Sequence, residues 1–176
     1  PDVEFIDLGR IDTSRPIDTP AGQHELIDRR RAGGLGTARG ELVCILEDRG
    51  IPDPDWLATM VRLHEQPYAA VGGAVECGVD RLLNQAIFFC DFSRYQLPFE
   101  AGARPYVTDV NIAYTRAALE ATRALWTERY HETTVNWALI REGGTLFLSP
   151  EPIVRQVRRN LRLGALLRER LDWGQL

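Results

Sequence analysis

The segment Leu42-Val43-Cys44-Ile45-Leu46-Glu47-Asp48-Arg49 decides the fold class. Its first five residues form an unbroken apolar run of strand length, the pattern expected when helices cover both faces of a parallel strand. Three charged residues follow where this strand ends, and ligands of open α/β sheets bind at that edge. The stretch therefore predicts an α/β domain with a polar site at residues 47–49.

The flanking segments extend this interpretation. Proline and Asp precede Trp56, and apolar residues then recur at helical spacing as far as Leu63. A second buried strand is expected over residues 69–75. Strand, helix and strand in this order predict a βαβ crossover and a mostly parallel central sheet flanked by helices. Further helices are expected over residues 23–32, 80–93, 116–125 and 132–142, and further strands over 3–8, 107–114 and 145–148. The Gly33-Gly34-Leu35-Gly36 stretch is expected to end the first helix.

Composition places the chain among soluble globular proteins. It has 176 residues, of which 44% are hydrophobic and 26% charged, enough for one domain with a sizeable core. A net charge of -4 argues against a nucleic-acid binder, and no apolar run reaches the roughly 18 residues that span a bilayer. We therefore expect a cytoplasmic protein.

Two residue types narrow the chemistry. All 21 basic residues are Arg, which excludes Schiff-base lysines and a P-loop lysine clamp. The cysteines at positions 44, 77 and 90 lack the C-x-x-C spacing of a zinc knuckle and suggest reduced thiols.

Four blocks of sequence fall in the order found in one enzyme family. They are the segment 40–57 around Glu47-Asp48-Arg49, Val71-Gly72-Gly73, Asn111-Ile112-Ala113-Tyr114-Thr115-Arg116, and His131-Glu132-Thr133-Thr134. Together they resemble the family 2 glycosyltransferases over roughly residues 33–150. The resemblance implies a GT-A fold and transfer of a sugar from a nucleotide-diphospho-sugar to a glycan or lipid-linked acceptor, as in polysaccharide biosynthesis.

The same resemblance assigns a metal site to the acidic segment. It places Glu47 and Asp48 on positions that hold Mg²⁺ or Mn²⁺, which neutralises the diphosphate of the donor. Arg49 stands where the family commonly has another acidic residue, and a guanidinium has no lone pair to offer a metal. Three interpretations stay open: metal binding by the two carboxylates, direct binding of a phosphate by Arg49, or a polar junction without a ligand.

The remaining candidate residues follow from the last two blocks. Glu132 resembles the general base of inverting members, with His131 as its partner or as a capping residue. Asn111 stands where the family has a polar residue near donor or acceptor, and Asp109 lies on the same side if the stretch is extended. The plainer alternatives are a carboxylate favoured at a helix start and hydrogen bonds at a strand end.

The two ends of the chain depart from the family. Family members open with a further strand and helix, so residues 1–152 are expected to form a domain that lacks this unit, with 3–8 as its second strand. Residues 153–176 are rich in Arg and Leu and predict an amphipathic helix that lies on an anionic membrane, or packs its Leu face on the domain or a partner. A homo-oligomer is compatible with the latter. The alternative function is a catalytically degenerate relative that binds a glycan, a nucleotide or a protein.

Overall fold

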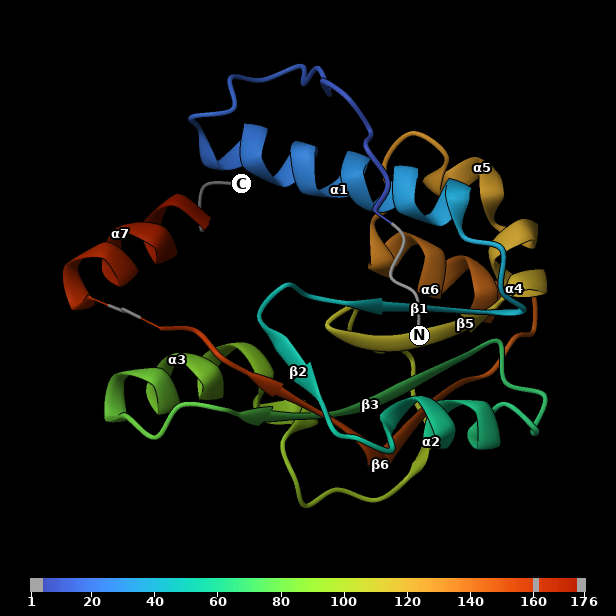
Figure 1. Ribbon diagram of the computed structural model, residues 1–176. Coiled ribbons are helices and arrows are strands. Elements are labelled where there is room, and N and C mark those ends of the chain that lie inside the picture. Colours follow the sequence, from blue (N-terminus) through green and yellow to red (C-terminus); the bar gives the residue numbers. More distant parts are fainter. Residues whose placement is uncertain (1–4, 160–161, 174–176) are drawn as a thin grey trace.

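The computed structural model describes residues 5–159 and 162–173. In chain order its elements are α1 (Pro20–Thr37), β1 (Leu42–Leu46), β2 (Gly50–Pro52), α2 (Trp56–Leu63), β3 (Ala70–Cys77), α3 (Leu82–Phe92), the 3-10 helix η1 (Ser93–Tyr95), β4 (Gly102–Ala103), β5 (Asn111–Thr115), α4 (Arg116–Ala121), α5 (Arg123–Trp126), α6 (Glu132–Arg141), β6 (Leu146–Gln156) and α7 (Leu163–Trp173). Figure 1 shows their arrangement.

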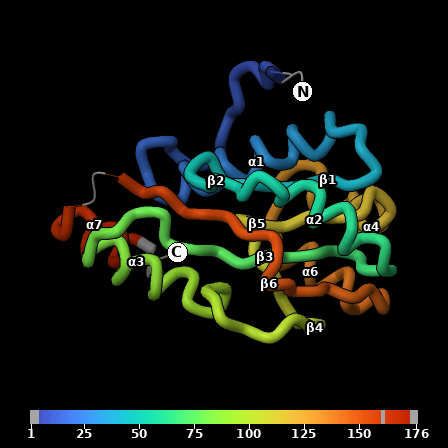
Figure 2. The backbone as a smooth tube through the Cα atoms, turned by 60° about the horizontal axis from the view of Figure 1, so that its bottom comes forward, coloured from blue at the N-terminus to red at the C-terminus, as the bar shows by residue number. Residues whose placement is uncertain are grey.

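The strands form one six-stranded mixed sheet in the order β1-β5-β3-β6-β2, with β4 also paired to β6. The α/β class is confirmed, but a mostly parallel sheet is wrong, because β3 and β6 form the one parallel pair among the described strands. β1 and β3 run in the same direction, as a crossover requires, yet the antiparallel strand β5 lies between them. Figure 2 shows β3 and β6 side by side through the middle of the molecule.

Helices cover both faces of the sheet, which explains the continuous apolar run of β1. Val43 and Ile45 join the cluster that includes residues of α1 and α6, whereas Cys44 and Leu46 pack against the cluster formed with α2. Successive side chains of a strand point to opposite faces, so each face receives alternate residues of the run. Burial raises the pKa of the Cys44 thiol to about 11, which keeps it neutral.

Helix α1 is longer than the sequence predicts, because it continues through the glycines at 33, 34 and 36. Each glycine costs up to about 1 kcal/mol in a helix, but packing overrides that preference here. Ala32 and Leu35 are buried in the core, and a Cβ on Gly33 would lie 2.9 Å from Cδ1 of Leu8. Residues 5–10 cross α1 as irregular chain, so the expected strand is wrong over 5–8; residues 3 and 4 lie outside the described part.

The carboxyl-terminal helix begins later than predicted. Residues 153–156 continue β6, since they pair with β3 from Ala74↔Ile153 to Cys77↔Gln156. The helical part, α7, starts at Leu163, and residues 160, 161 and 174–176 lie outside the described part. Arg170 of α7 forms an ion pair with Asp91 of α3, so these helices lie at one end of the molecule in both views. None of the described helices combines the length and apolarity needed to cross a bilayer.

Candidate active site

The pairing of β1 with β5 brings two of the predicted site segments together. Leu46, the last residue of β1, pairs with Asn111, the first residue of β5. Glu47 comes directly after Leu46, and Asp109 lies two residues before Asn111. The loop before β5 also runs along α6, because Nδ2 of Asn136 donates a 2.7 Å hydrogen bond to the carbonyl of Val107 and the Tyr106 hydroxyl donates to Glu132 at the start of the helix. One edge of the sheet therefore gathers the acidic turn, the loop at 106–110 and the start of α6.

Glu132 is the first residue of α6, and its side chain is 18% exposed. The hydroxyl of Tyr106 donates a 2.7 Å hydrogen bond to Oε1 of Glu132. Burial and this carboxylate raise the pKa of the Tyr106 phenol above its usual range, so the hydroxyl stays protonated and remains a donor. Oε2 lies 3.9 Å from Nδ1 of the exposed His131. One oxygen is thus held by Tyr106, and the other lies beside the exposed imidazole of His131. A general base needs one oxygen within hydrogen-bond reach of the acceptor hydroxyl.

Asp109 is a buried carboxylate beside Glu132. Burial and the charge of Glu132 raise the pKa of Asp109 to about 7, although its ion pair with Arg31 of α1 acts in the opposite direction. Glu47 also raises this pKa, so the two carboxylates act on the same group. Asp109 therefore exchanges a proton near neutral pH, an environment typical of functional sites.

Glu25 holds α1, and with it Arg31, over this edge. Its carboxylate accepts hydrogen bonds from the backbone N–H and the hydroxyl of Ser14, at 2.9 Å and 2.6 Å. It also accepts from Arg129, just before α6, at 2.6 Å. These partners, the Ser14 hydroxyl above all, lower the pKa of Glu25 to about 2, so the anchor stays charged at any physiological pH.

Asn111 forms hydrogen bonds inside the domain, and its contact with donor or acceptor stays a prediction. Its side chain is fully buried, and Oδ1 accepts a 2.8 Å hydrogen bond from Nε1 of Trp56. Nδ2 donates to the carbonyl oxygens of Ala74 and Pro152, each at 2.8 Å. The amide thus joins α2, β3, β5 and β6 and has no group directed at a ligand.

The acidic segment forms the turn between β1 and β2. Oε2 of Glu47 accepts a 2.7 Å hydrogen bond from Nε2 of Gln156, while Asp48 and Arg49 are exposed. Within the described part of the chain, no group of three His, Cys, Asp or Glu side chains is placed to hold a metal ion. Because Mg²⁺ is often held by only one or two carboxylates together with substrate phosphates, metal binding by Glu47 and Asp48 stays a prediction.

No family model matches this sequence, and no curated protein matches it significantly. Whatever is inferred about its chemistry depends on the residues described above.

Several site residues are absent from the sequence-based prediction. The hydroxyl of Tyr95 is buried and has no hydrogen-bond partner among the described residues. Burial chiefly raises the pKa of Tyr95, with contributions from Glu132 and Asp109, so the hydroxyl lies in the field of both carboxylates. Tyr95 and Tyr106 lie at the two ends of the Pro- and Gly-containing loop after α3. Loops of this kind often carry binding residues, so the loop was the sequence feature that could have indicated them.

Proposed function

We propose that this domain is an inverting glycosyltransferase with a GT-A-type architecture, which moves a sugar from a nucleotide-diphospho-sugar to an acceptor hydroxyl. The observation that carries the proposal is the geometry of Glu132: a partly buried carboxylate at a helix start, held through Oε1 by Tyr106, with Oε2 3.9 Å from the exposed His131. It lies at the edge where β1 ends, which is where ligands of α/β domains bind.

In the proposed reaction the acceptor hydroxyl donates a hydrogen bond to Oε2 of Glu132. As the acceptor oxygen forms its bond to the anomeric carbon, its proton passes to Oε2. The bond from the anomeric carbon to the diphosphate oxygen breaks on the opposite face of the sugar, and the nucleoside diphosphate leaves with that electron pair. The configuration at the anomeric carbon is therefore inverted. Tyr106 keeps the carboxylate oriented through its hydrogen bond to Oε1.

The acceptor class that fits best is a lipid-linked glycan at the cytoplasmic face of a membrane. Three leucines at every fourth position of α7 support it, because they form an apolar stripe that no described residue covers. Leu163, Leu167 and Leu171 are 60%, 58% and 69% exposed, whereas Leu166 packs into the domain. Exposed arginines border the stripe at positions 162 and 168, as in helices that lie on anionic lipid.

The test of this function is the hydrolysis of a panel of nucleotide-sugars by the protein, with water as the acceptor, followed as release of nucleoside diphosphate. We expect Glu132→Gln to slow release by about 100-fold or more, the usual contribution of a general base. Glu142→Gln, at the other end of α6, is the matched control and leaves the rate unchanged. Equal rates for both folded variants would contradict the assignment. Donor binding without turnover in the wild type would favour the non-catalytic binding module, for which the arginine at position 49 is the supporting observation.

A further inference from the structure

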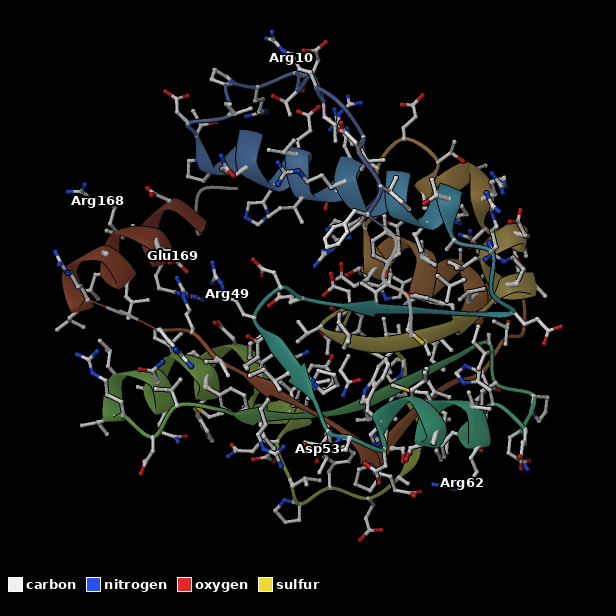
Figure 3. The ribbon with its side chains drawn as sticks, in the orientation of Figure 1. Arg10, Arg49, Asp53, Arg62, Arg168 and Glu169 are labelled. Carbon is white, nitrogen blue, oxygen red and sulfur yellow. The ribbon has the colours of Figure 1, made fainter. Side chains whose placement is uncertain are left out.

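A second polar region lies beside the acidic turn. A surface pocket of about 320 Å³ opens between the β1–β2 turn, the chain that follows β6 and the first turn of α7. Its lining contains four arginines: Arg49, Arg158, Arg159 and Arg162. Figure 3 shows Arg49 and Glu169 of α7 facing one another across this region, while Arg168 points away from it.

The charges of this arginine pocket are unbalanced. Glu169 is the one acidic residue of the lining, so four positive charges face one negative charge. Its carboxylate is occupied by Arg158, which donates to Oε1 at 3.0 Å, and the Arg158 guanidinium lowers the pKa of Glu169. Among the described residues, Arg49, Arg159 and Arg162 make no ion pair. Guanidinium groups stay charged at any working pH, so the pocket favours an anion of high charge.

Hydrogen bonds to the backbone position two of these arginines, Arg49 and Arg158. The N–H of Val157 donates a 2.8 Å hydrogen bond to the carbonyl of Arg49, which joins the turn to the end of β6. Asn84, buried in α3, donates to the carbonyl of Arg158. The first turn of α7 contributes Ala165 and Leu166 to the wall, and the start of a helix carries partial positive charge. The turn and the end of β6 are therefore held side by side, with Arg49 on one and Arg158 just beyond the other.

We propose that this pocket binds the phosphate or diphosphate group of a substrate through its arginines, without a metal ion. Guanidinium groups match phosphate oxygens in a bidentate geometry and supply the neutralisation that a divalent cation would otherwise give. Two observations meet in this assignment: no three candidate metal ligands gather at the turn in the described part of the chain, and Arg49 of the same turn lines the pocket. The identification of the anion as the leaving diphosphate of a donor rests on the proposed function. The proposal that a phosphate site is present does not depend on that function.

The experiment is calorimetric titration of the protein with inorganic pyrophosphate, in EDTA and separately in Mg²⁺. The expected result is binding in EDTA that Arg49→Gln weakens by about tenfold or more, because a bidentate pair is lost. Arg162→Gln has the same effect. Arg168→Gln removes the same charge from the other side of α7 and leaves the affinity within about twofold. Glu169→Gln removes the internal counter-ion and strengthens binding.

Three results would overturn the proposal: binding that appears only with Mg²⁺, an equal loss of affinity in Arg168→Gln, or no binding to the folded protein. Nucleoside diphosphates and vesicles containing phosphatidic acid then identify the source of the phosphate, because whichever competes with pyrophosphate occupies the pocket. Failure here with nucleotide-sugar turnover intact leaves the transferase proposal standing. Arginine-dependent pyrophosphate binding without nucleotide-sugar turnover would support the phosphate site and contradict the transferase proposal.

Discussion

Nε2 of Gln156 donates a 2.7 Å hydrogen bond to Oε2 of Glu47, across 109 residues of sequence. The bond joins the last residue of β6 to the first residue of the acidic turn. It uses one of the carboxylate oxygens that a metal at Glu47 would need. The same part of β6 leads directly into the arginine pocket, so the end of β6 shapes both the acidic turn and the basic wall beside it.

Loss of the Tyr106 hydroxyl should reduce catalysis more than binding. Tyr106→Phe keeps the ring but removes the hydrogen bond to Oε1 of Glu132, so the base is less well oriented. We expect kcat to fall by about tenfold, corresponding to a hydrogen bond to a charged group, with little change in KM. Steady-state kinetics on the best donor of the panel measure this. A rise in KM at constant kcat would show that Tyr106 contacts the substrate instead.

The buried carboxyl of Asp109 should make stability fall as the pH rises. Its folded pKa of about 7 lies above the ordinary value of 3.8, so the folded state binds the extra proton between these values. Relative to Asp109→Asn, the wild type should lose about 1.4 kcal/mol of unfolding free energy per pH unit within that window, and nothing further above it. Urea unfolding of both proteins from about pH 4.5 to about pH 8 gives this difference. If the wild type instead gained unfolding free energy relative to Asp109→Asn as the pH rises, the prediction would be contradicted.

Asn111 should be required for stability. Asn111→Ala removes three buried hydrogen bonds and strands the Trp56 N–H and two carbonyl oxygens. We expect the free energy of unfolding to fall by about 2–4 kcal/mol, measured by urea titration. If Asn111→Ala kept wild-type stability but bound the donor more weakly, the result would support the ligand contact that the family resemblance implies.

The leucine stripe of α7 should bind lipid. Leu167→Ser removes apolar surface from the middle of the stripe and should lower the partition onto vesicles of anionic lipid by about tenfold. Leu57→Ser is the control, since Leu57 is 60% exposed on α2, outside the stripe. Co-sedimentation with vesicles measures the partition, and equal effects of the two substitutions would exclude α7 as the contact.

Local patterns predicted much of the fold. The apolar run at 42–46 and the periodicity at 56–63 gave a correct strand and a correct helix, because the signals lie within a few residues. Strand order could not be read in this way. The place of β5 between β1 and β3 depends on contacts distant in sequence, and so does the extension of β6 to Gln156.

The candidate site shows the same division. The sequence named Asp109 and Glu132, and the structure places the two carboxylates close enough that the charge of Glu132 raises the pKa of Asp109. Arg31 and Gln156 were not predicted, since their roles depend on how α1 lies over the sheet and on the register of β6. Of the arginine pocket, the sequence indicated only Arg49 as a phosphate-binding residue. The other arginines come from a segment that was predicted to be an amphipathic helix.

The most direct measurement is proton NMR of the sugar transferred by the protein, recorded early enough to observe the first-formed anomer. Each nucleotide-sugar is supplied with an acceptor alcohol, and the configuration at the anomeric carbon is compared with that of the donor. The account predicts a product of inverted configuration, formed by the wild type and lost in Glu132→Gln. Retention of configuration, or no transfer from any donor by the folded protein, would contradict it.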